Sequence, residues 1–323
     1  MIATAARRLR PYVEIARVDH WFKNAFMVLG VVLAAFYRPE MLTLALVPKL
    51  ALAVFATCLV ASSNYVLNEL LDAPTDALHP EKRSRPVPSG RVNRVAGYVE
   101  WLALAAVGFS LAALIGLPFV ASAVLLWLMG IVYNVPPIRS KELPYVDVLT
   151  ESINNPIRLL LGWFAVIDDR VPPVSLLIAY WMLGAFFMAI KRYGELRHIG
   201  DSRVAAAYRR SFAHYTEERL LVSVLFYAVA CALFGGIFIV RYHLELILFT
   251  PFVAGLFAFY LQLGLMPDSP AQNPERLYRQ RGFVAYVGLC FGVFVILMFT
   301  EIPALYQWFN VEPSVTPTLW RLG

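Results

Sequence analysis

A run of polar residues between positions 68 and 86 interrupts an otherwise apolar chain and contains side chains that could do chemistry. Its acids and one amide recur at spacings that place them on one face of a helix. Carboxylate and amide oxygens suit Mg²⁺, and basic side chains suit phosphate oxygens. The run therefore predicts a site for a metal-bound diphosphate. The predicted metal ligands are Asn68, Glu69, Asp72 and Asp76, with Asp72 and Asp76 as catalytic residues, and the predicted substrate-binding residues are Asn68, Lys82, Arg83 and Arg85.

The alternative for this run is a solvated acidic turn at the end of a helix, balanced by the three cations. Pro74 favours that alternative, because proline breaks or kinks a helix and would do so before Asp76. Carboxylates a few ångströms apart repel one another unless a cation or protons compensate. This repulsion favours the metal site.

A second polar run, from Lys191 to His198, has a different balance of charge. Lys191 and Glu195 share a helical face with His198, so that one carboxylate lies beside at least two cations. Such a surface binds phosphate more readily than it binds a metal alone. The alternative is the basic flank of a membrane segment. We predict catalytic roles for Lys191 and Glu195 and substrate contacts for Arg192 and Tyr193, and leave the role of His198 open.

Further polar residues lie at the ends of hydrophobic segments or inside them. Lys23 and Asn24 stand where the first segment begins, and the stretch from Tyr133 to Lys141 leaves another segment through two prolines. An arginine inside a membrane helix rarely faces lipid, so Arg158 is expected to point into a cavity or to pair with an acid. Its candidate partners are Asp147 and Glu151, and a substrate-binding role is equally open. Lys23, Tyr133, Lys141 and Arg158 complete the predicted substrate-binding set.

The elements that must position these residues are membrane helices. Hydrophobic residues make up 59% of the 323 positions and charged residues 15%, which indicates an integral membrane protein. Segments of roughly 20 apolar residues are long enough to cross ~30 Å of hydrocarbon. The predicted fold class is all-α, a polytopic bundle of nine transmembrane helices. They are expected near residues 24–37, 43–68, 95–115, 118–136, 145–167, 172–194, 219–240, 244–266 and 282–306.

Most of the 28 Lys and Arg residues fall on one side of such a bundle if the N-terminus is inside. Cytoplasmic loops carry an excess of these residues, so the pattern predicts an N-in, C-out protein of the inner (plasma) membrane. Residues 1–23 are expected to form an interfacial segment. Both polar runs belong to long cytoplasmic loops, near residues 69–94 and 191–218, which places the chemistry on the cytoplasmic side. One domain covers residues 1–323.

Several other classes of function have no support in the sequence. The net charge of +6 follows from the cytoplasmic loops and requires no nucleic acid. The three cysteines lie within predicted spans without metal-ligand or disulfide spacing. No Ser–His–Asp arrangement, phosphate-binding glycine loop or dinucleotide fingerprint occurs. No cleavable signal is evident, so the first hydrophobic helix is expected to act as the insertion signal.

The chain resembles the UbiA superfamily of intramembrane prenyltransferases over nearly its whole length. The first family motif, N-D-x-x-D-x-x-x-D, is matched by Asn68, Asp72 and Asp76, with Glu69 in place of the usual Asp. The second motif, usually D-x-x-x-D, is not matched. Lys191 stands at its first acid and Glu195 at its second.

Two features make the chain similar to the decaprenyl-phosphate phosphoribosyltransferase branch. One is this departure in the second motif, and the other is the W-x-K-N sequence at Trp21–Asn24. The resemblance implies a Mg²⁺-dependent membrane enzyme that moves a 5-phosphoribosyl group from phosphoribosyl diphosphate to a polyprenyl phosphate and releases diphosphate. Two phosphorylated substrates bring more negative charge than one, which suits the exchange of a carboxylate for a cation. Membrane lipid is the other expected partner, and a homo-oligomer is left open.

Two rival functions are distinguishable from the sequence. An orthodox UbiA prenyltransferase would move a prenyl group from an allylic diphosphate to an aromatic or lipid acceptor, and it would need the second acidic motif. A phosphate-recognising lipid transporter would carry acids in mid-helix along a path. Nearly all charge here lies instead at the predicted cytoplasmic ends, which favours the transferase.

Overall fold

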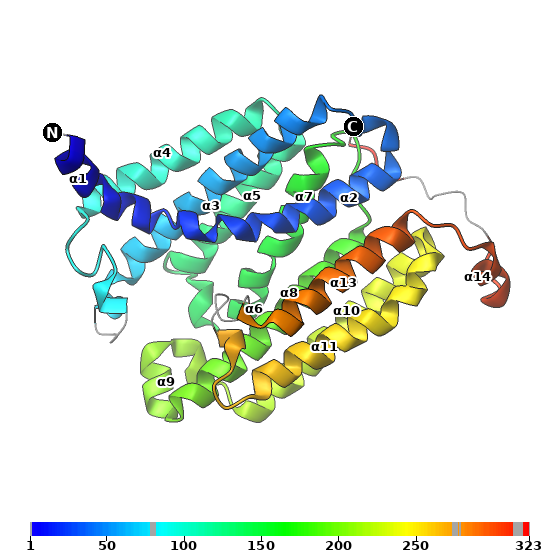
Figure 1. The fold of residues 1–323 in the computed structure, drawn as a ribbon. Coiled ribbons are helices and arrows are strands. Elements are labelled where there is room, and N and C mark those ends of the chain that lie inside the picture. The colour runs from blue at the N-terminus through cyan, green and yellow to red at the C-terminus, as the bar shows by residue number, and fades with distance from the viewer. Residues whose placement is uncertain (1, 78–81, 273–276, 278, 313–318, 323) are drawn as a thin grey trace. The chain divides into compact units, whose positions relative to one another are not determined.

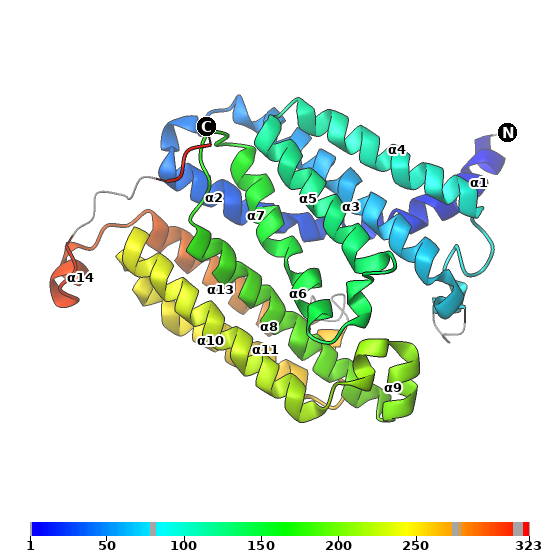
Figure 2. The same ribbon diagram turned by 180° about the vertical axis from the view of Figure 1, so that it is seen from behind.

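The computed structural model describes residues 2–77, 82–272, 277, 279–312 and 319–322, and within them the protein is built from helices. Eight helical segments in this part of the chain are long and apolar enough to cross a membrane. The all-α membrane fold predicted from the sequence is thereby confirmed. The chain groups into two compact units (Figures 1 and 2). The first unit comprises Met1–Lys141 and Ile157–Asp168, and the second comprises Glu142–Pro156 and Asp169–Gly323.

The first unit is organised around one long helix, α3, which packs mainly against α4 and α5. α3 has 31 residues and is therefore about 46 Å long, more than a bilayer's ~30 Å hydrocarbon core requires. Its polar C-terminal end can thus extend beyond the hydrocarbon. The helices of this unit are α1 (Ile2–Ile15), η1 (Val18–Phe26), α2 (Met27–Tyr37), η2 (Pro39–Met41), α3 (Leu46–Asp76), η3 (Lys82–Ser84), α4 (Arg94–Ala113), α5 (Leu117–Asn134) and most of α7 (Asn154–Phe164).

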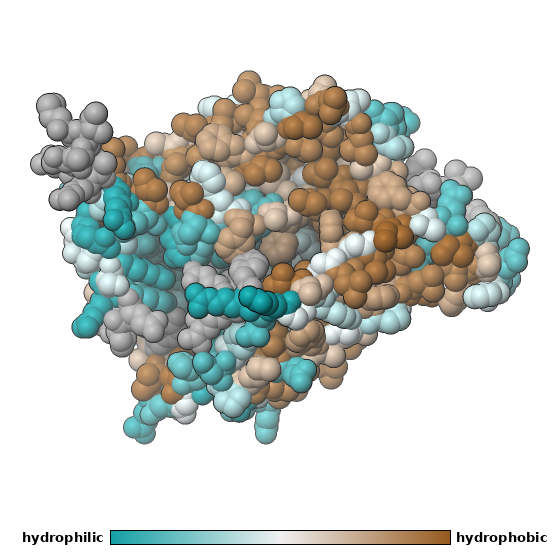
Figure 3. All heavy atoms as spheres, viewed as in Figure 1, coloured by the Kyte–Doolittle hydropathy of each residue, from teal (hydrophilic) through white to brown (hydrophobic). Residues whose placement is uncertain are grey.

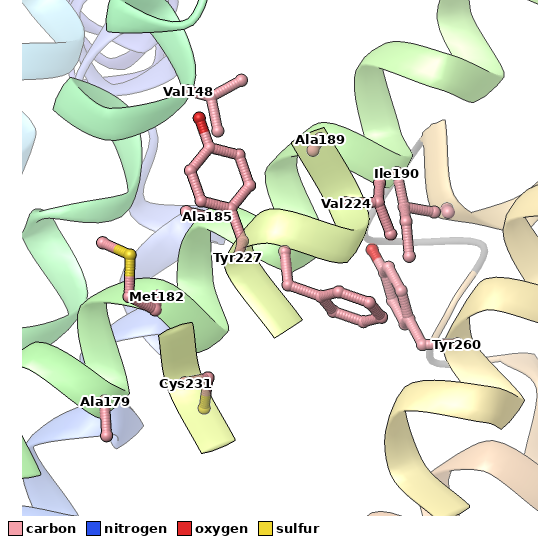
Figure 4. Packing of buried hydrophobic residues seen from close by; sticks show 12 residues of the cluster. Val148, Ala179, Met182, Ala185, Ala189, Ile190, Val224, Tyr227, Cys231 and Tyr260 are labelled. Atoms are coloured by element: carbon pink, nitrogen blue, oxygen red, sulfur yellow. The ribbon is translucent and has the colours of Figure 1, made fainter. Parts of the chain in front are cut away.

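The second unit is organised around α8, which packs mainly against α10. Figure 4 shows its core, where Met182 and Ala185 of α8 lie among Tyr227 of α10 and Tyr260 of α11. The helices of this unit are α6 (Val146–Ser152), α8 (Val174–Ile199), α9 (Ser202–Tyr208), η5 (Arg210–Ala213), α10 (Glu217–Tyr242), η6 (Leu244–Phe249), α11 (Thr250–Leu265), η7 (Pro270–Gln272), α13 (Arg281–Met298) and α14 (Pro303–Trp308).

Apolar side chains also cover the outer faces of the membrane-length helices. Val284, Phe291 and Ile296 of α13 are exposed, as are Val229 and Leu233 of α10. Figure 3 shows mostly hydrophobic side chains along α13. Exposed apolar faces of this extent suit a lipid environment.

The helix predicted over residues 145–167 is not continuous. α6 ends at Ser152 and α7 begins at Asn154, so the two short helices together replace one span. Neither is long enough to count among the eight candidate spans of the described residues, and the predicted total of nine and the N-in orientation stay predictions. The first span is longer than predicted, because the segment Leu9–Tyr37 is helical almost throughout.

The sequence allowed for a break or a kink at Pro74, and a break does not occur, since α3 continues through Pro74 to Asp76. Proline lacks only the one N–H that would bond to the carbonyl four residues earlier, and the helix resumes its ladder when Ala77 donates to Ala73 O at 3.0 Å. Pro74 is exposed, so its ring meets no neighbouring helix that would force a break. Asp72 and Asp76 therefore stand one turn apart on the same helix.

Candidate functional site

Asp72 lies near the C-terminal end of α3 and is held by two cations from the segment after α5. Arg139 Nη2 donates to Asp72 Oδ1 at 3.1 Å, and Lys141 Nζ contacts the same oxygen. Arg139 has a φ of 34°, in the left-handed region that non-glycine residues rarely adopt. The tight turn after α5 thus brings both cations to one carboxylate oxygen.

Asp76 and Glu69 face cations and backbone from the segment that follows α3. Arg85 Nη1 donates to Asp76 Oδ2 at 2.7 Å, and Lys82 Nζ lies 3.9 Å from Asp76 Oδ1. Glu69 is buried and accepts a hydrogen bond from the backbone N–H of Val87 at 3.1 Å. Glu69 thereby anchors the segment that carries the cations. The first cluster is defined as Glu69, Asp72, Asp76, Lys82, Arg85, Arg139 and Lys141.

Asn68 and Tyr133 support the first cluster through Lys141. Asn68 Nδ2 donates to Asn134 Oδ1 at 2.5 Å, and Lys141 Nζ donates to the same oxygen at 2.9 Å. The ammonium of Lys141 also lies 5.9 Å from the centre of the Tyr133 ring. The structure thus brings together most of the predicted first site. Arg83 is exposed and makes no hydrogen bond or ion pair within the described residues.

The carboxylates of the first cluster fit a divalent cation that also binds the phosphate of a ligand. Both recorded contacts of Asp72 fall on Oδ1, and among the described residues none falls on Oδ2. The described part of the chain holds no group of three or more acidic, histidine or cysteine side chains that could enclose a metal. Mg²⁺ commonly takes one or two carboxylates and completes its shell with water and substrate phosphates. Asp72 and Asp76 can supply that partial set.

Lys23 and Arg158 lie farther along α3 from the first cluster. Lys23 Nζ is 5.7 Å from the centre of the Tyr65 ring, and Tyr65 stands two helical turns before Asp72 on the same face. Arg158 Nε donates to Asn24 Oδ1 at 2.9 Å, and Asn24 Nδ2 contacts Cys58 Sγ at 3.1 Å. Asn24 therefore orients Arg158 in the interior of the first unit. Pairing of Arg158 with Asp147 or Glu151 stays a prediction.

In the second unit, Arg192 is the centre of a buried ion-pair network. Its guanidinium donates to Asp147 at 3.0 Å and to Glu195 at 2.9 Å, and a third nitrogen donates to Glu151 at 2.7 Å. The Arg192 and Asp147 side chains are 1% and 0% exposed. A buried charge is tolerated only when it is paired and hydrogen-bonded, and here each of the three guanidinium nitrogens donates to a carboxylate. These contacts favour a positioning role for Arg192 over the direct substrate contact expected from the sequence.

The other residues of the second polar run differ in how far they are engaged. Lys191 is half-buried, interacts electrostatically with Glu195, and makes no hydrogen bond or ion pair within the described residues. Tyr193 is buried and donates to Glu217 of α10 at 3.2 Å. His198 is exposed on the last turn of α8. Lys191 is therefore the residue of this run best placed to receive an anion.

Asp147 also fastens the connection between α8 and α10 to the start of α6. Tyr215 donates its hydroxyl proton to Asp147 Oδ1 at 2.5 Å and accepts from the backbone N–H of Tyr145 at 2.6 Å. Burial raises the pKa of Tyr215 well above its ordinary value, and the charge of Asp147 raises it further. The hydroxyl thus stays protonated and remains a donor. The second cluster is defined as Asp147, Glu151, Lys191, Arg192, Glu195 and Arg209.

Sequence reasoning missed several residues of both clusters. Arg139 could have been found, because it stands two residues before Lys141 in the same short basic stretch. Asn134 carried no signal beyond a polar residue at the end of an apolar segment. Tyr215 and Arg209 contact Asp147, from which each is separated by more than sixty residues in the sequence. A helical spacing rule cannot anticipate contacts of that kind.

Curated relatives are 25–31% identical to this chain over the parts that align. It is 31% identical over 202 residues to nodulation protein NoeC of Azorhizobium caulinodans, which covers 62% of either protein. It is 29% identical over 220 residues to decaprenyl-phosphate phosphoribosyltransferase of Mycolicibacterium smegmatis, covering 64% of this chain and 63% of the relative. Protoheme IX farnesyltransferase of Shouchella clausii is 25% identical over 217 residues, or 64% of this chain and 68% of that protein. The chain thus spans just over three fifths of the length of the first two relatives.

Solved structures share the fold at low identity. A UbiA homolog from Archaeoglobus fulgidus bound to GPP and Mg²⁺ aligns with a TM-score of 0.64 and 16% identity, over 92% of this chain and 99% of the other. The apo UbiA homolog from Aeropyrum pernix aligns with a TM-score of 0.60 and 17% identity, over 86% and 98% of the two chains. The family model of the UbiA prenyltransferases matches residues 24–287. With the helical fold and the acidic end of α3 in place, this match shows that the chain belongs to the UbiA prenyltransferase family.

Proposed function

We propose that this protein transfers the 5-phosphoribosyl group of phosphoribosyl diphosphate to a polyprenyl phosphate and releases diphosphate. The observation that carries the proposal is Lys191. Its ammonium has no hydrogen-bonding or ion-pair partner within the described residues, and it occupies the position where the family's second acidic motif would begin. A cation at that place suits a second phosphorylated substrate, whereas a carboxylate would repel it.

The first cluster is the proposed binding site for the leaving diphosphate. Four cations contact Asp72 and Asp76, namely Arg139, Lys141, Lys82 and Arg85. Asp72 and Asp76 are the residues that would hold a divalent cation, and the lysine and arginine side chains beside them would donate to phosphate oxygens. Charge-assisted hydrogen bonds from lysine and arginine are the strongest that proteins offer to phosphate.

The reaction would break the bond between ribose C1 and the diphosphate oxygen and form a bond from C1 to an oxygen of the lipid phosphate. Mg²⁺, when bound, would neutralise charge that develops on the leaving diphosphate. The lipid phosphate is already ionised, so no strong general base is needed. The residues of this chain would contribute mainly by orienting both substrates and by placing positive charge where negative charge develops.

The second cluster is proposed to hold the sugar 5-phosphate or the phosphate of the lipid. Lys191 would contact the phosphate directly. Glu195 would orient the ribose or Lys191, and Arg192 would fix Glu195 and Glu151 through its ion pairs. Tyr193, which donates a hydrogen bond to Glu217 of α10, would help to hold this part of α8 in place.

Lys23, Asn68, Tyr133 and Arg158 are proposed to line the path of the lipid-linked substrate along α3. Lys23 lies beside Tyr65 on the face of α3 that carries Asn68 and Asp72. The inner (plasma) membrane and a site facing the cytoplasm remain part of this proposal.

Two comparisons bear on the choice of substrate. Similarity to decaprenyl-phosphate phosphoribosyltransferase of Mycolicibacterium smegmatis supports the phosphoribosyl reaction. The alternative is an orthodox prenyltransferase, supported by the farnesyltransferase relative and by the homolog bound to GPP. The first cluster would serve either reaction, because both release a diphosphate. We expect the second cluster to distinguish them, because a cation at Lys191 suits a second phosphorylated substrate.

The proposal is tested by incubating the purified protein in lipid nanodiscs with Mg²⁺, polyprenyl phosphate and phosphoribosyl diphosphate labelled in the ribose. Label is expected to enter the organic phase in proportion to protein and time. Chelation of the metal should stop it. A wild-type protein that leaves all label in water at saturating substrate would refute the proposed reaction.

A further inference from the structure

The connection between α8 and α10 brings an arginine from a distant part of the sequence to the second cluster. Arg209 stands between α9 and η5, and its Nη1 lies 3.4 Å from Asp147 Oδ2. Its charge also acts on the carboxylate of Glu195, as does that of Lys191. Arg209 and Lys191 therefore lie within electrostatic reach of the same acid, although they come from different elements.

Arg209 and Arg192 both contact Asp147 but differ in exposure. The Arg192 side chain is 1% exposed and Arg209 is 19% exposed. The Arg192 contact is also shorter, at 3.0 Å against 3.4 Å. Arg192 is thus a buried structural cation, whereas Arg209 can be reached from outside the cluster.

Asp147 would remain satisfied if Arg209 moved away. Its Oδ1 accepts from the Tyr215 hydroxyl at 2.5 Å, and its Oδ2 accepts from Arg192 as well as from Ser211 Oγ at 3.4 Å. Leaving a buried carboxylate without donors is costly, but here donors remain on each oxygen. If an anion drew Arg209 away, the buried carboxylate of Asp147 would therefore keep its other hydrogen-bond donors.

The geometry points to Arg209 as a phosphate-binding residue that exchanges Asp147 for a phosphomonoester group, which it holds together with Lys191. A phosphomonoester carries up to two negative charges and three acceptor oxygens, enough for a guanidinium fork and an ammonium at once. This inference deepens the proposed function, on which the identity of the substrate rests. The group could be the 5-phosphate of the donor or the phosphate of the lipid.

Direct binding tests the inference without requiring turnover. Ribose 5-phosphate and a short-chain polyprenyl phosphate are titrated separately into the full-length protein in nanodiscs, with the melting temperature as readout. The wild type is expected to be stabilised by at least one of the two in a saturable manner. Absence of any stabilisation by either compound would overturn the inference.

The variant Arg209→Gln is expected to weaken that binding by about 10- to 100-fold, the usual range for a lost hydrogen bond to a charged group. Arg210→Gln is the matched control. It removes the same charge from the next residue, whose side chain is 83% exposed and whose recorded partner is Glu142 at 3.5 Å. Equal losses in both variants would show a general effect of surface charge and would overturn the inference.

Arg209→Lys keeps the charge but loses the planar fork, and it is expected to recover part of the affinity. It also keeps the test decisive should Arg209→Gln fold poorly. If Arg209→Lys binds both compounds as weakly as the glutamine variant while melting like the wild type, or if Arg209→Gln binds both like the wild type, Arg209 does not hold the phosphate.

Kinetics of label transfer then identify which phosphate is bound. Arg209→Gln should raise the apparent KM of one substrate, donor or lipid phosphate, and leave the other within twofold of the wild type. A fall in kcat alone, with both KM values unchanged, would indicate a purely structural residue and overturn the inference. Arg209-dependent binding of ribose 5-phosphate in a protein that transfers no phosphoribosyl group would instead refute the proposed function and leave this site standing.

Discussion

Asp72 is contacted by two cations at one carboxylate oxygen and by none at the other within the described residues, and we propose that it holds the metal ion. We expect Asp72→Asn to reduce transfer by about 100-fold or more, in line with the loss of one group that stabilises transition-state charge. The variant should keep the wild-type melting temperature to within a few degrees, because asparagine keeps the shape and one acceptor. Initial rates of label transfer over a Mg²⁺ titration measure the effect.

Glu40→Gln provides the control for Asp72→Asn, since Glu40 is an exposed acid in η2. This control should transfer like the wild type. Normal turnover by Asp72→Asn at saturating Mg²⁺ would remove the metal from the proposed mechanism.

Lys191 is the residue that separates the proposed reaction from an orthodox prenyl transfer. Lys191→Asp reverses a charge beside anionic oxygens, and at ~4 Å one such contact is worth about 4 kcal/mol at an effective dielectric of 20, before solvent screening. After discounting for its partial exposure, we expect the apparent KM for the phosphoribosyl donor to rise by more than about 10-fold. Lys191→Arg should retain most of the affinity. Unchanged donor kinetics in Lys191→Asp would show that this position does not meet the donor.

The residues that could be predicted are those joined by local spacing. Asp72 and Asp76 lie one turn apart, and the cations after α3 follow within a few positions, so a helical reading of the sequence found them. The contacts that a substrate would meet in the second unit depend instead on Asp147 and Tyr215, which lie far apart in the chain. Only the folded structure shows that these two residues are partners.

At the scale of elements, α2 and α7 pack closely because each has a glycine at the crossing. A Cβ added to Gly30 would meet the backbone of Leu159 and lie 2.7 Å from Trp163 N, and one added to Gly162 would meet the backbone of Met27. Small residues let membrane helices approach in this way. α7 carries Arg158, whose contact with Asn24 depends on the same approach.

We therefore expect Gly162→Val to destabilise the protein by about 1–3 kcal/mol, the usual cost of overpacking, and to lower the melting temperature in nanodiscs by several degrees. Gly292→Val is the matched control, because a Cβ added in α13 meets nothing within 4 Å. Equal melting temperatures for the two variants would mean that α2 and α7 do not need this close packing.

The helices themselves were largely predictable from apolar runs, and their ends from polar residues. Asn93, Asp201 and Thr216 cap α4, α9 and α10 through their side chains, as such residues commonly do. The break between α6 and α7 carries a local signal that the search for apolar runs overlooked, because the residues around Ile153 are mostly polar and Pro156 follows them. Pro74 argued for a break, but α3 continues through it because the helix loses only one hydrogen bond there and the proline ring is exposed.

At the scale of the whole molecule, the distribution of charge predicts which side of the membrane each loop faces. Thr43→Cys, between α2 and α3, is expected on the outer side, and Ala207→Cys, in α9, on the cytoplasmic side; both positions are exposed. The native cysteines are buried, so background labelling should be low. In intact cells, a membrane-impermeant maleimide should label the first variant alone. Labelling of Ala207→Cys alone would reverse the orientation.

The family and its fold follow from the sequence as a whole, whereas the substrate depends on a few charges in one cluster. The most direct test of the central claim gives the wild-type protein both donor types in parallel under identical Mg²⁺ and lipid conditions. One reaction contains phosphoribosyl diphosphate and polyprenyl phosphate, and the other contains an allylic prenyl diphosphate and an aromatic acceptor. Mass spectrometry of the lipid products is expected to show a phosphoribosylated polyprenyl phosphate and no prenylated aromatic compound; the opposite result would contradict the account.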